Sequence, residues 1–131
     1  MSSKKEFLTE LVRANDLNTD EDVFSKELKG RRLAFITRTG IEKIQYKNNI
    51  VVKFDWISMS KDYACIKATA TMGDVVIETF GSAWHGQGGN CMSNYVAEMA
   101  EKRSLARAVL KAVGAGKYAV YGEDESDDFK K

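Results

Sequence analysis

The residues of this sequence best suited to chemistry are four cations in a segment of helical periodicity near the C-terminus. Arg103, Arg107 and Lys111 follow one another at spacings of four residues, and Lys102 precedes the first of them. Residues four apart lie one above another on an α-helix, so we expect these cations along one face. Such a row, with its charges at the rim, suits successive phosphates of a nucleic acid. The structural alternative is an ordinary solvated helix face.

A second group of residues combines basic and aromatic side chains in the middle of the chain. Lys53 and Lys67 are expected on adjacent strands, and Trp84 at the start of a glycine-rich loop, residues 81–90. Cations for phosphates and rings for stacked bases are the combination that single-stranded nucleic-acid binding uses. Trp84 is the best stacking candidate because it begins a loop of low intrinsic order.

Catalytic and metal-binding chemistry find little support in the sequence. The chain has one histidine, His85, and two isolated cysteines, Cys65 and Cys91, which do not make a structural zinc motif. His85 has no serine or cysteine partner at a recognisable spacing. The glycines at 86–89 are not followed by Gly-Lys-Ser/Thr, so no nucleotide-phosphate loop is expected. We therefore expect no enzymatic activity, no metal and no cofactor.

The elements that must position these side chains include a β-rich middle. Three runs alternate as strands do and are separated by short turns: residues 50–59, 63–72 and 75–83. Short turns predict an antiparallel meander. Phe54 and Trp56 share a face with Val52, and we predict that both pack in the core.

Helical patterns flank this middle part. The predicted helices are residues 3–14, 19–29, 39–46 and a long one that is capped by Ser93 or Asn94 and runs through Val113. A short strand is predicted at 33–37, and the apolar segment 118–121 suits an edge strand. In the long helix, the buried stripe is Val96, Met99, Ala106, Leu110 and Val113. Another side is small and permits close approach of a neighbouring element or subunit: Ala97, Ala100, Ala108 and Ala112.

Together these elements predict a single α+β domain, for which 131 residues suffice. An N-terminal helical segment, residues 1–30, precedes a β-β-β-α core, residues 31–122. The core consists of a three-stranded antiparallel meander with the long helix packed on it. Residues 123–131 form an acidic tail that we expect to be disordered.

The distribution of charge is more informative than the net charge of +1. Five acidic residues lie between positions 123 and 128, and the rest of the chain has 14 acidic and 20 basic residues. A mildly basic body suits an anion-binding protein, and the tail suits a protein partner or simple solubilisation. No apolar run is long enough for a membrane span, so we expect a cytoplasmic protein with reduced cysteines and no membrane contact.

The segment Tyr95–Gly114 resembles the terminal helix of phage-encoded single-strand annealing proteins. This superfamily has a β-β-β-α core and includes the eukaryotic recombination mediator. The shared features are the pattern Glu-x-Ala-x-x-Arg-x-x-x-Arg-Ala, an apolar pair after it and a closing glycine. Residues 36–44 resemble the short helix before the meander, and the strand that ends at 78–81 also fits. The resemblance covers residues 31–122.

The resemblance implies single-stranded DNA binding, and strand annealing in phage-type recombination or replication, in the host cytoplasm if the protein is phage-encoded. It also implies a homo-oligomer, as a ring or filament, with the DNA in a positive groove between sheet and helix. Arg107 and Lys111 match the DNA-contacting positions best, and Arg103 and Lys102 match less closely.

Three other functions remain open from the residues alone. A double-stranded RNA-binding module has a similar element order, but it places lysines at the start of its last helix, where this chain has Tyr95 and Glu98. An interaction or inhibitor protein would use the alanine-rich side and the acidic tail as contact surfaces. An enzyme for a small ligand in a cone-shaped α+β fold would need polar residues converging inside the sheet, and none can be identified.

Overall fold

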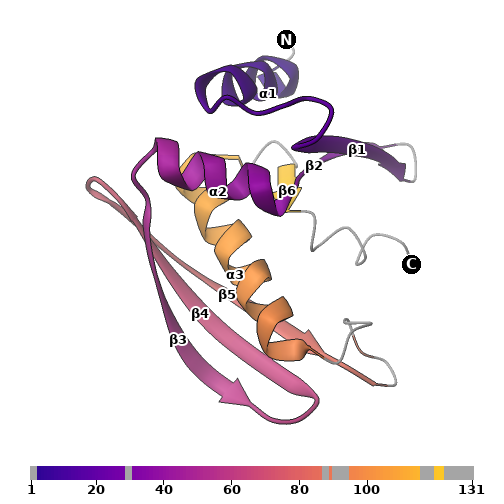
Figure 1. The fold of residues 1–131 in the computed structure, drawn as a ribbon, viewed down its shortest axis with the longest axis vertical. Helices are drawn as coiled ribbons and strands as arrows, with labels where there is room; N and C mark the ends of the chain where they lie inside the picture. Colours follow the sequence, from indigo (N-terminus) through magenta and orange to yellow (C-terminus); the bar gives the residue numbers. More distant parts are fainter. Residues whose placement is uncertain (1–2, 29–30, 87–88, 90–94, 116–119, 123–131) are drawn as a thin grey trace.

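The computed structural model describes residues 3–28, 31–86, 89, 95–115 and 120–122. In chain order the elements are α1 (Ser3–Ala14), β1 (Val23–Leu28), β2 (Arg31–Ile36), α2 (Arg38–Lys47), β3 (Val51–Met59), β4 (Tyr63–Met72), β5 (Val75–Trp84), α3 (Val96–Ala112) and β6 (Val120–Gly122). Within these residues the strands form two three-stranded sheets, in the orders β1-β2-β6 and β3-β4-β5. The predicted α+β class, with the last helix packed on a sheet, is confirmed (Figure 1).

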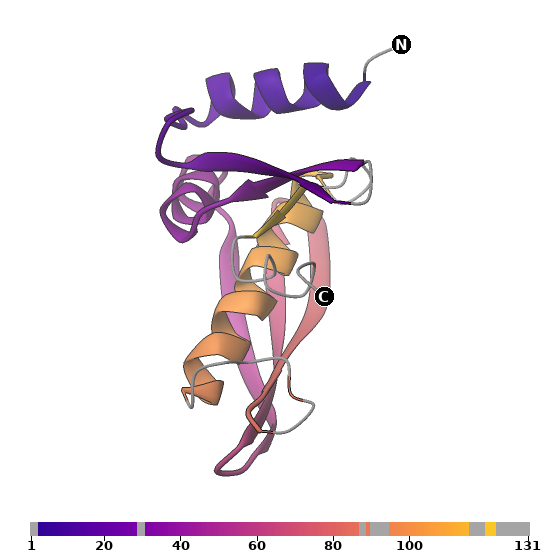
Figure 2. The same ribbon diagram turned by 90° about the vertical axis from the view of Figure 1, so that its right-hand side faces the viewer.

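The predicted antiparallel meander is the larger of the two sheets. β4 pairs with β3 from Thr71↔Val51 to Ala64↔Met59, and with β5 from Tyr63↔Trp84 to Met72↔Val75. Side chains alternate between the faces of a strand, and in β4 the even-numbered residues from Ala64 to Ala70 are fully buried. They form the face on which α3 packs, as Figure 2 shows from the side.

The helix α3 lies over β4 and β5 and barely reaches β3. Close approach is possible because small residues meet: a Cβ on Gly81 would lie 2.4 Å from the carbonyl oxygen of Ala100 and 2.5 Å from the amide nitrogen of Ser104. The hydroxyl of Thr79 donates to the Ser104 carbonyl oxygen at 2.9 Å. The prediction that the small side of this helix admits a close neighbour is therefore confirmed, and β5 provides that neighbour.

A second layer covers the C-terminal half of α3. It consists of α2 and the sheet β1-β2-β6, where β6 is an edge strand parallel to β2 (Figures 1 and 2). The main core lies between the layers and includes Ile36, Ile41, Ile44 and Val109. β6 confirms an edge strand at 120–121; residues 118–119, the loop around 87–94 and the tail 123–131 lie outside the described residues.

The end of α3 follows the predicted pattern. Gly114 has a φ of 81°, and its N–H donates to the Lys111 carbonyl oxygen while that of Ala115 donates to Leu110. This pair of bonds is a Schellman motif, which satisfies the last carbonyls of a helix and favours glycine at the left-handed position. The helix begins at Val96, and its N-cap is Tyr95, which makes no side-chain cap hydrogen bond, so the predicted cap at Ser93 or Asn94 is wrong; both of these residues lie outside the described part of the chain.

The predicted helix over residues 19–29 is wrong. The side chain of Asn18 accepts hydrogen bonds from the backbone N–H groups of Asp20 and Glu21, so the acidic run forms a turn. The chain then enters β1, which pairs with β2 from Val23↔Ile36 to Leu28↔Arg31. The acidic residues favour a helix start, but the polar turn and the partner strand outweigh that preference.

The N-terminal segment is fastened to the rest of the domain by buried polar groups. The carboxylate of Asp22 is buried and accepts from the Lys43 ammonium at 2.6 Å and from the Asn18 N–H at 2.8 Å. Burial by itself would raise the pKa of Asp22, but the Asn18 N–H and the Lys43 ammonium outweigh it and hold this pKa below its usual value. Leu11 and Leu17 also belong to the main core.

No helix in the described part of the chain is long and apolar enough to cross a bilayer.

Candidate nucleic-acid interface

Two of the predicted cations, Arg103 and Arg107, lie along the outer edge of β5. Arg103 donates from Nη1 to the carbonyl oxygen of Ser82 at 2.8 Å, and Arg107 donates from Nη1 to that of Phe80 at 2.7 Å. The helix numbering rises as the strand numbering falls, so α3 and β5 are antiparallel. Each step of four residues along the helix therefore corresponds to a step of two residues along the strand.

This correspondence follows from the dimensions of the two elements. Four residues of α-helix rise about 6.0 Å. Two residues of β-strand span about 6.6 Å. Arginines at spacing four on the helix therefore meet every second residue of the strand, whose carbonyls all point to the same edge. These two arginines satisfy carbonyls that β5, as an outer strand of the sheet, cannot satisfy with another strand.

The prediction that Arg103 holds its charge at a solvent rim is wrong. The side chain is 1% exposed, among the largest fully buried side chains of the described residues. A buried guanidinium requires hydrogen-bonding partners, and the Ser82 carbonyl is one of them. Arg107 and Lys111 are exposed. The row thus divides into one buried structural cation and two exposed cations further along the helix.

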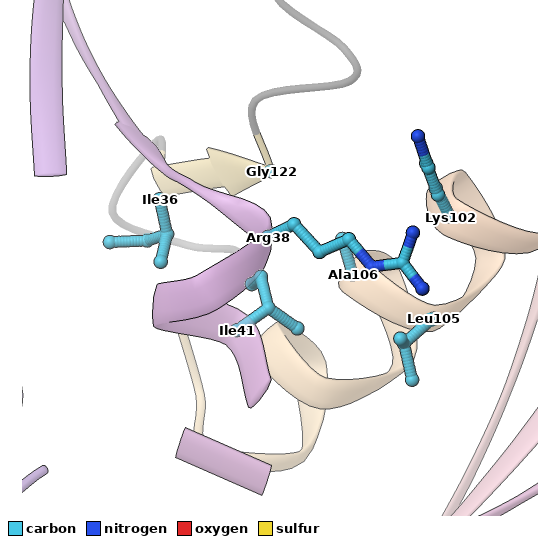
Figure 3. A pocket seen from close by; sticks show the side chains of 7 residues that line it. All are labelled: Ile36, Arg38, Ile41, Lys102, Leu105, Ala106 and Gly122. Atoms are coloured by element: carbon cyan, nitrogen blue, oxygen red, sulfur yellow. The ribbon is translucent and has the colours of Figure 1, made fainter. Parts of the chain in front are cut away.

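Lys102 belongs to a different surface. It lines a small pocket between α2, α3 and β6, together with Ile36, Arg38, Ile41, Leu105, Ala106 and Gly122 (Figure 3). In Figure 3 the Arg38 side chain extends across this pocket towards α3. The interior volume is about 10 Å³, room for no more than one water molecule, so a nucleotide base does not fit. Lys102 does not lie on the β5 edge beside Arg107.

The face of the meander opposite α3 carries exposed aromatic rings. Directly opposite residues on paired strands share a face, which places Tyr63 beside Trp84 and Lys67 beside Phe80. Phe80 is 52% and Trp84 is 49% exposed. Phe80 also connects the two surfaces, because its carbonyl binds Arg107 while its ring lies on this open face. Exposed rings and the exposed Arg107 therefore flank the same strand, β5.

The charges on the open face nearly cancel. The Lys67 ammonium lies 3.7 Å from a carboxylate oxygen of Glu78, and Asp55 is directly opposite Lys67 on β3. The pKa of Tyr63 is above its usual value, because an ionised Cys65 would place a like charge beside the phenolate and because burial and a hydrogen bond to Cys65 disfavour ionisation. Tyr63 therefore remains a neutral ring. This face offers stacking surface more than positive charge.

β3 departs from the prediction. Trp56 was expected to pack in the core, but its side chain is 53% exposed, whereas Phe54 is half-buried and packs against both clusters of the core. The cause is the position of α3, which covers β4 and β5 and leaves the far half of β3 uncovered. Lys53 is exposed on this strand, two strands away from Arg107, so it does not join the β5 surface.

Phe80 and Tyr63 are the interface candidates that sequence reasoning missed. The sequence did contain a usable signal, because in the paired strands Phe80 follows the alternation that also places Trp84 on the open face. This alternation assigns Phe80 to the open face only once the register of β4 and β5 is known.

The comparisons with known proteins add no assignment to this geometry. No protein-family model matches the chain, and searches of curated proteins and of solved structures return no match. Within the described residues, no group of three His, Cys, Asp or Glu side chains is arranged to hold a metal ion.

Proposed function

We propose that this protein binds single-stranded DNA along β5, and that strand annealing in phage-type recombination or replication is its task. The observation that carries the proposal is the position of Phe80, whose carbonyl holds Arg107 and whose ring is exposed beside Lys67 and near Trp84. Phosphates would lie towards Arg107 and Lys111, and bases would stack on the two rings. The resemblance of Tyr95–Gly114 to annealing proteins supports the same function.

The aromatic half of this proposal is tested with Phe80→Ala and Trp84→Ala. Each ring is about half exposed on a face that no described helix or strand covers, so the fold should tolerate its removal. Loss of one stacked base costs about 1–3 kcal/mol, or about 5- to 150-fold in affinity. Tyr46→Ala is the matched control, because Tyr46 is 83% exposed on α2, away from β5. Equal affinities for the three variants, measured by fluorescence anisotropy, would argue against stacking on β5.

The electrostatic half is tested with Lys111→Glu. Two exposed cations predict a slope of about −1.4 in log affinity against log salt on a single strand, and Lys111→Glu should reduce its magnitude by at least about 0.7. Arg13→Glu on α1 makes the same change in net charge at an exposed site far from β5. The double charge reversal of Arg107 and Lys111 should weaken binding further while circular dichroism stays native. An unchanged slope in Lys111→Glu would exclude this part of the helix from the site.

The nature of the ligand is decided by one titration with three probes. Single-stranded DNA, duplex DNA and duplex RNA are compared at two salt concentrations. We expect the single strand to bind most tightly, because exposed rings stack on unpaired bases that a duplex does not offer. Preference for duplex RNA would favour the RNA-binding module, and failure to bind any of the three would reject a nucleic-acid function. Annealing is then measured as faster pairing of complementary strands.

A further inference from the structure

The geometry points to a self-association surface on β3: we infer that two copies of this chain pair through their β3 strands, antiparallel and about a two-fold axis, into one continuous six-stranded sheet. Among the strands that the structure describes, β3 is an outer strand of the meander and pairs with β4 alone. Its second half is exposed on both faces and includes Trp56, Ile57 and Met59. An exposed apolar outer strand is a ready template for pairing with another chain. This inference does not rest on the proposed function.

The other outer strand of the meander is already occupied at residues 80 and 82. The outward carbonyls of Phe80 and Ser82 on β5 already accept hydrogen bonds from Arg107 and Arg103. A head-to-tail contact, in which β3 of one copy adds to β5 of the next, would have to displace both guanidinium groups. A contact of β3 with β3 displaces neither. The same patch then meets itself, which gives a closed two-fold dimer rather than an open chain.

Among axes at residues 53, 54 and 55, the charges of β3 favour the one at residue 54. A two-fold axis beside Phe54 places Lys53 of each copy directly opposite Asp55 of the other. Moving the axis to residue 53 or 55 would instead place two lysines or two aspartates opposite each other. Opposite charges at facing positions stabilise a strand pair, and like charges destabilise it. Within the described part of the chain, neither Lys53 nor Asp55 has an ion pair in the single copy.

The position of α3 leaves room for this arrangement. In the chosen register both copies turn the same face of β3 towards their helices, and α3 stays clear because it lies over β4 and β5 (Figure 1). Trp56 of each copy would meet the half-buried Val52 of the other, which covers an indole that is 53% exposed in one copy. The paired stretch from 52 to 56 includes Trp56 and ends where the β3–β4 register shifts, between Trp56 and Ser58, so Ile57 and Met59 lie beyond it.

The experiment uses two charge-reversed variants, alone and mixed. Lys53→Asp and Asp55→Lys each place like charges opposite one another twice in a symmetric dimer. An equimolar mixture restores two opposite-charge pairs in the mixed dimer. Mass is measured by sedimentation equilibrium against the 14.6 kDa of one chain. We expect a wild-type dimer, at least about a tenfold weaker dimer for each variant alone, and recovery of the dimer on mixing.

The controls separate the interface from the fold. Lys61→Asp, in the turn between β3 and β4, makes the same charge change outside the paired stretch and should leave the dimer intact. Circular dichroism of each variant confirms that β3 still forms, and a variant that fails to fold is replaced by Lys53→Glu or Asp55→Arg. The inference is overturned by a wild-type chain that stays at 14.6 kDa at a few hundred micromolar. It is overturned equally by an oligomer that neither variant weakens, or by variants that do not recover on mixing.

Discussion

The two outer strands of the meander end the same sheet in opposite ways. β5 lies beneath α3, and two arginines of that helix bind its outward carbonyls. β3 lies mostly beyond the reach of the helix, and its second half is exposed with Trp56, Ile57 and Met59. The difference teaches that arginines on a helix beside a sheet need not serve a ligand. Two outward carbonyls of β5 are satisfied within the chain, whereas β3 is the edge that we infer to pair with a second copy.

The largest effect that tests this contrast is expected for Gly81→Ala in β5. The added Cβ would lie within 2.5 Å of the backbone of α3, and backbone cannot move aside as a flexible side chain can. We expect a loss of about 3 kcal/mol or more in the free energy of unfolding, measured by urea denaturation. At Gly73, in the β4–β5 turn, a Cβ meets no atom, so Gly73→Ala should cost only the left-handed backbone strain of about 1–2 kcal/mol. Equal losses would mean that α3 does not approach β5 this closely.

The next largest effect is expected for Arg103→Met. The substitution keeps most of the buried stem but leaves the Ser82 carbonyl without its guanidinium donor, at a cost of about 2–3 kcal/mol in unfolding free energy. Lys53→Met on β3 is the matched change on the open strand and should stay within about 0.5 kcal/mol at concentrations where the chain is monomeric. A stable Arg103→Met protein would show that the arginine does not hold the edge of β5.

A smaller effect on stability is expected for Arg107→Met. This arginine makes the same kind of bond as Arg103, but it is exposed, so water can replace it at the Phe80 carbonyl. We expect a loss of about 1 kcal/mol. Hydrogen exchange of the β5 amides should become faster near residues 78–80 and stay unchanged in β4. A loss as large as that of Arg103→Met would mean that the two arginine–carbonyl hydrogen bonds are equally shielded from water.

The smallest effect is expected for Trp56→Ser. In a single copy the indole is more exposed than buried and lies outside both core clusters, so the unfolding free energy in dilute solution should change by no more than about 0.5 kcal/mol. Phe54→Ser, two residues away, removes a ring that packs in both clusters and should cost several times more. A strongly destabilised Trp56→Ser monomer would place that ring in the core after all.

The meander and the long helix were predictable because their signals are local. Alternation gave the strands to within one or two residues, and the glycine at 114 marked the end of α3. The helix predicted over 19–29 failed because acidic residues suit a turn as well as a helix start. The spacing from Leu28 to Arg31, with Gly30 between, is that of a two-residue hairpin and was the signal available for β1.

The candidate site was predictable only in part, because it depends on where one element lies over another. Spacing alone placed Arg103, Arg107 and Lys111 on one side of the helix. It could not tell that Arg103 would be buried against Ser82, since that depends on the edge strand beneath it. Likewise, Phe54 and Trp56 share a periodicity, and only the offset of α3 towards β5 decides which of the two is covered.

The matching of helix and strand along β5 limits how much of an edge one helix can protect. Four residues of helix rise about 6.0 Å, whereas two residues of strand span about 6.6 Å. Helix and strand therefore fall out of step by about 0.6 Å from one arginine to the next. The mismatch accumulates, and strand twist turns the edge away from a straight helix. An arginine side chain can adjust to the accumulated offset over two or three successive arginine–carbonyl hydrogen bonds, but not over a whole ten-residue strand. A single helix can therefore satisfy the outward carbonyls of only part of an edge strand. The rest of a longer edge would require a second helix or a neighbouring chain.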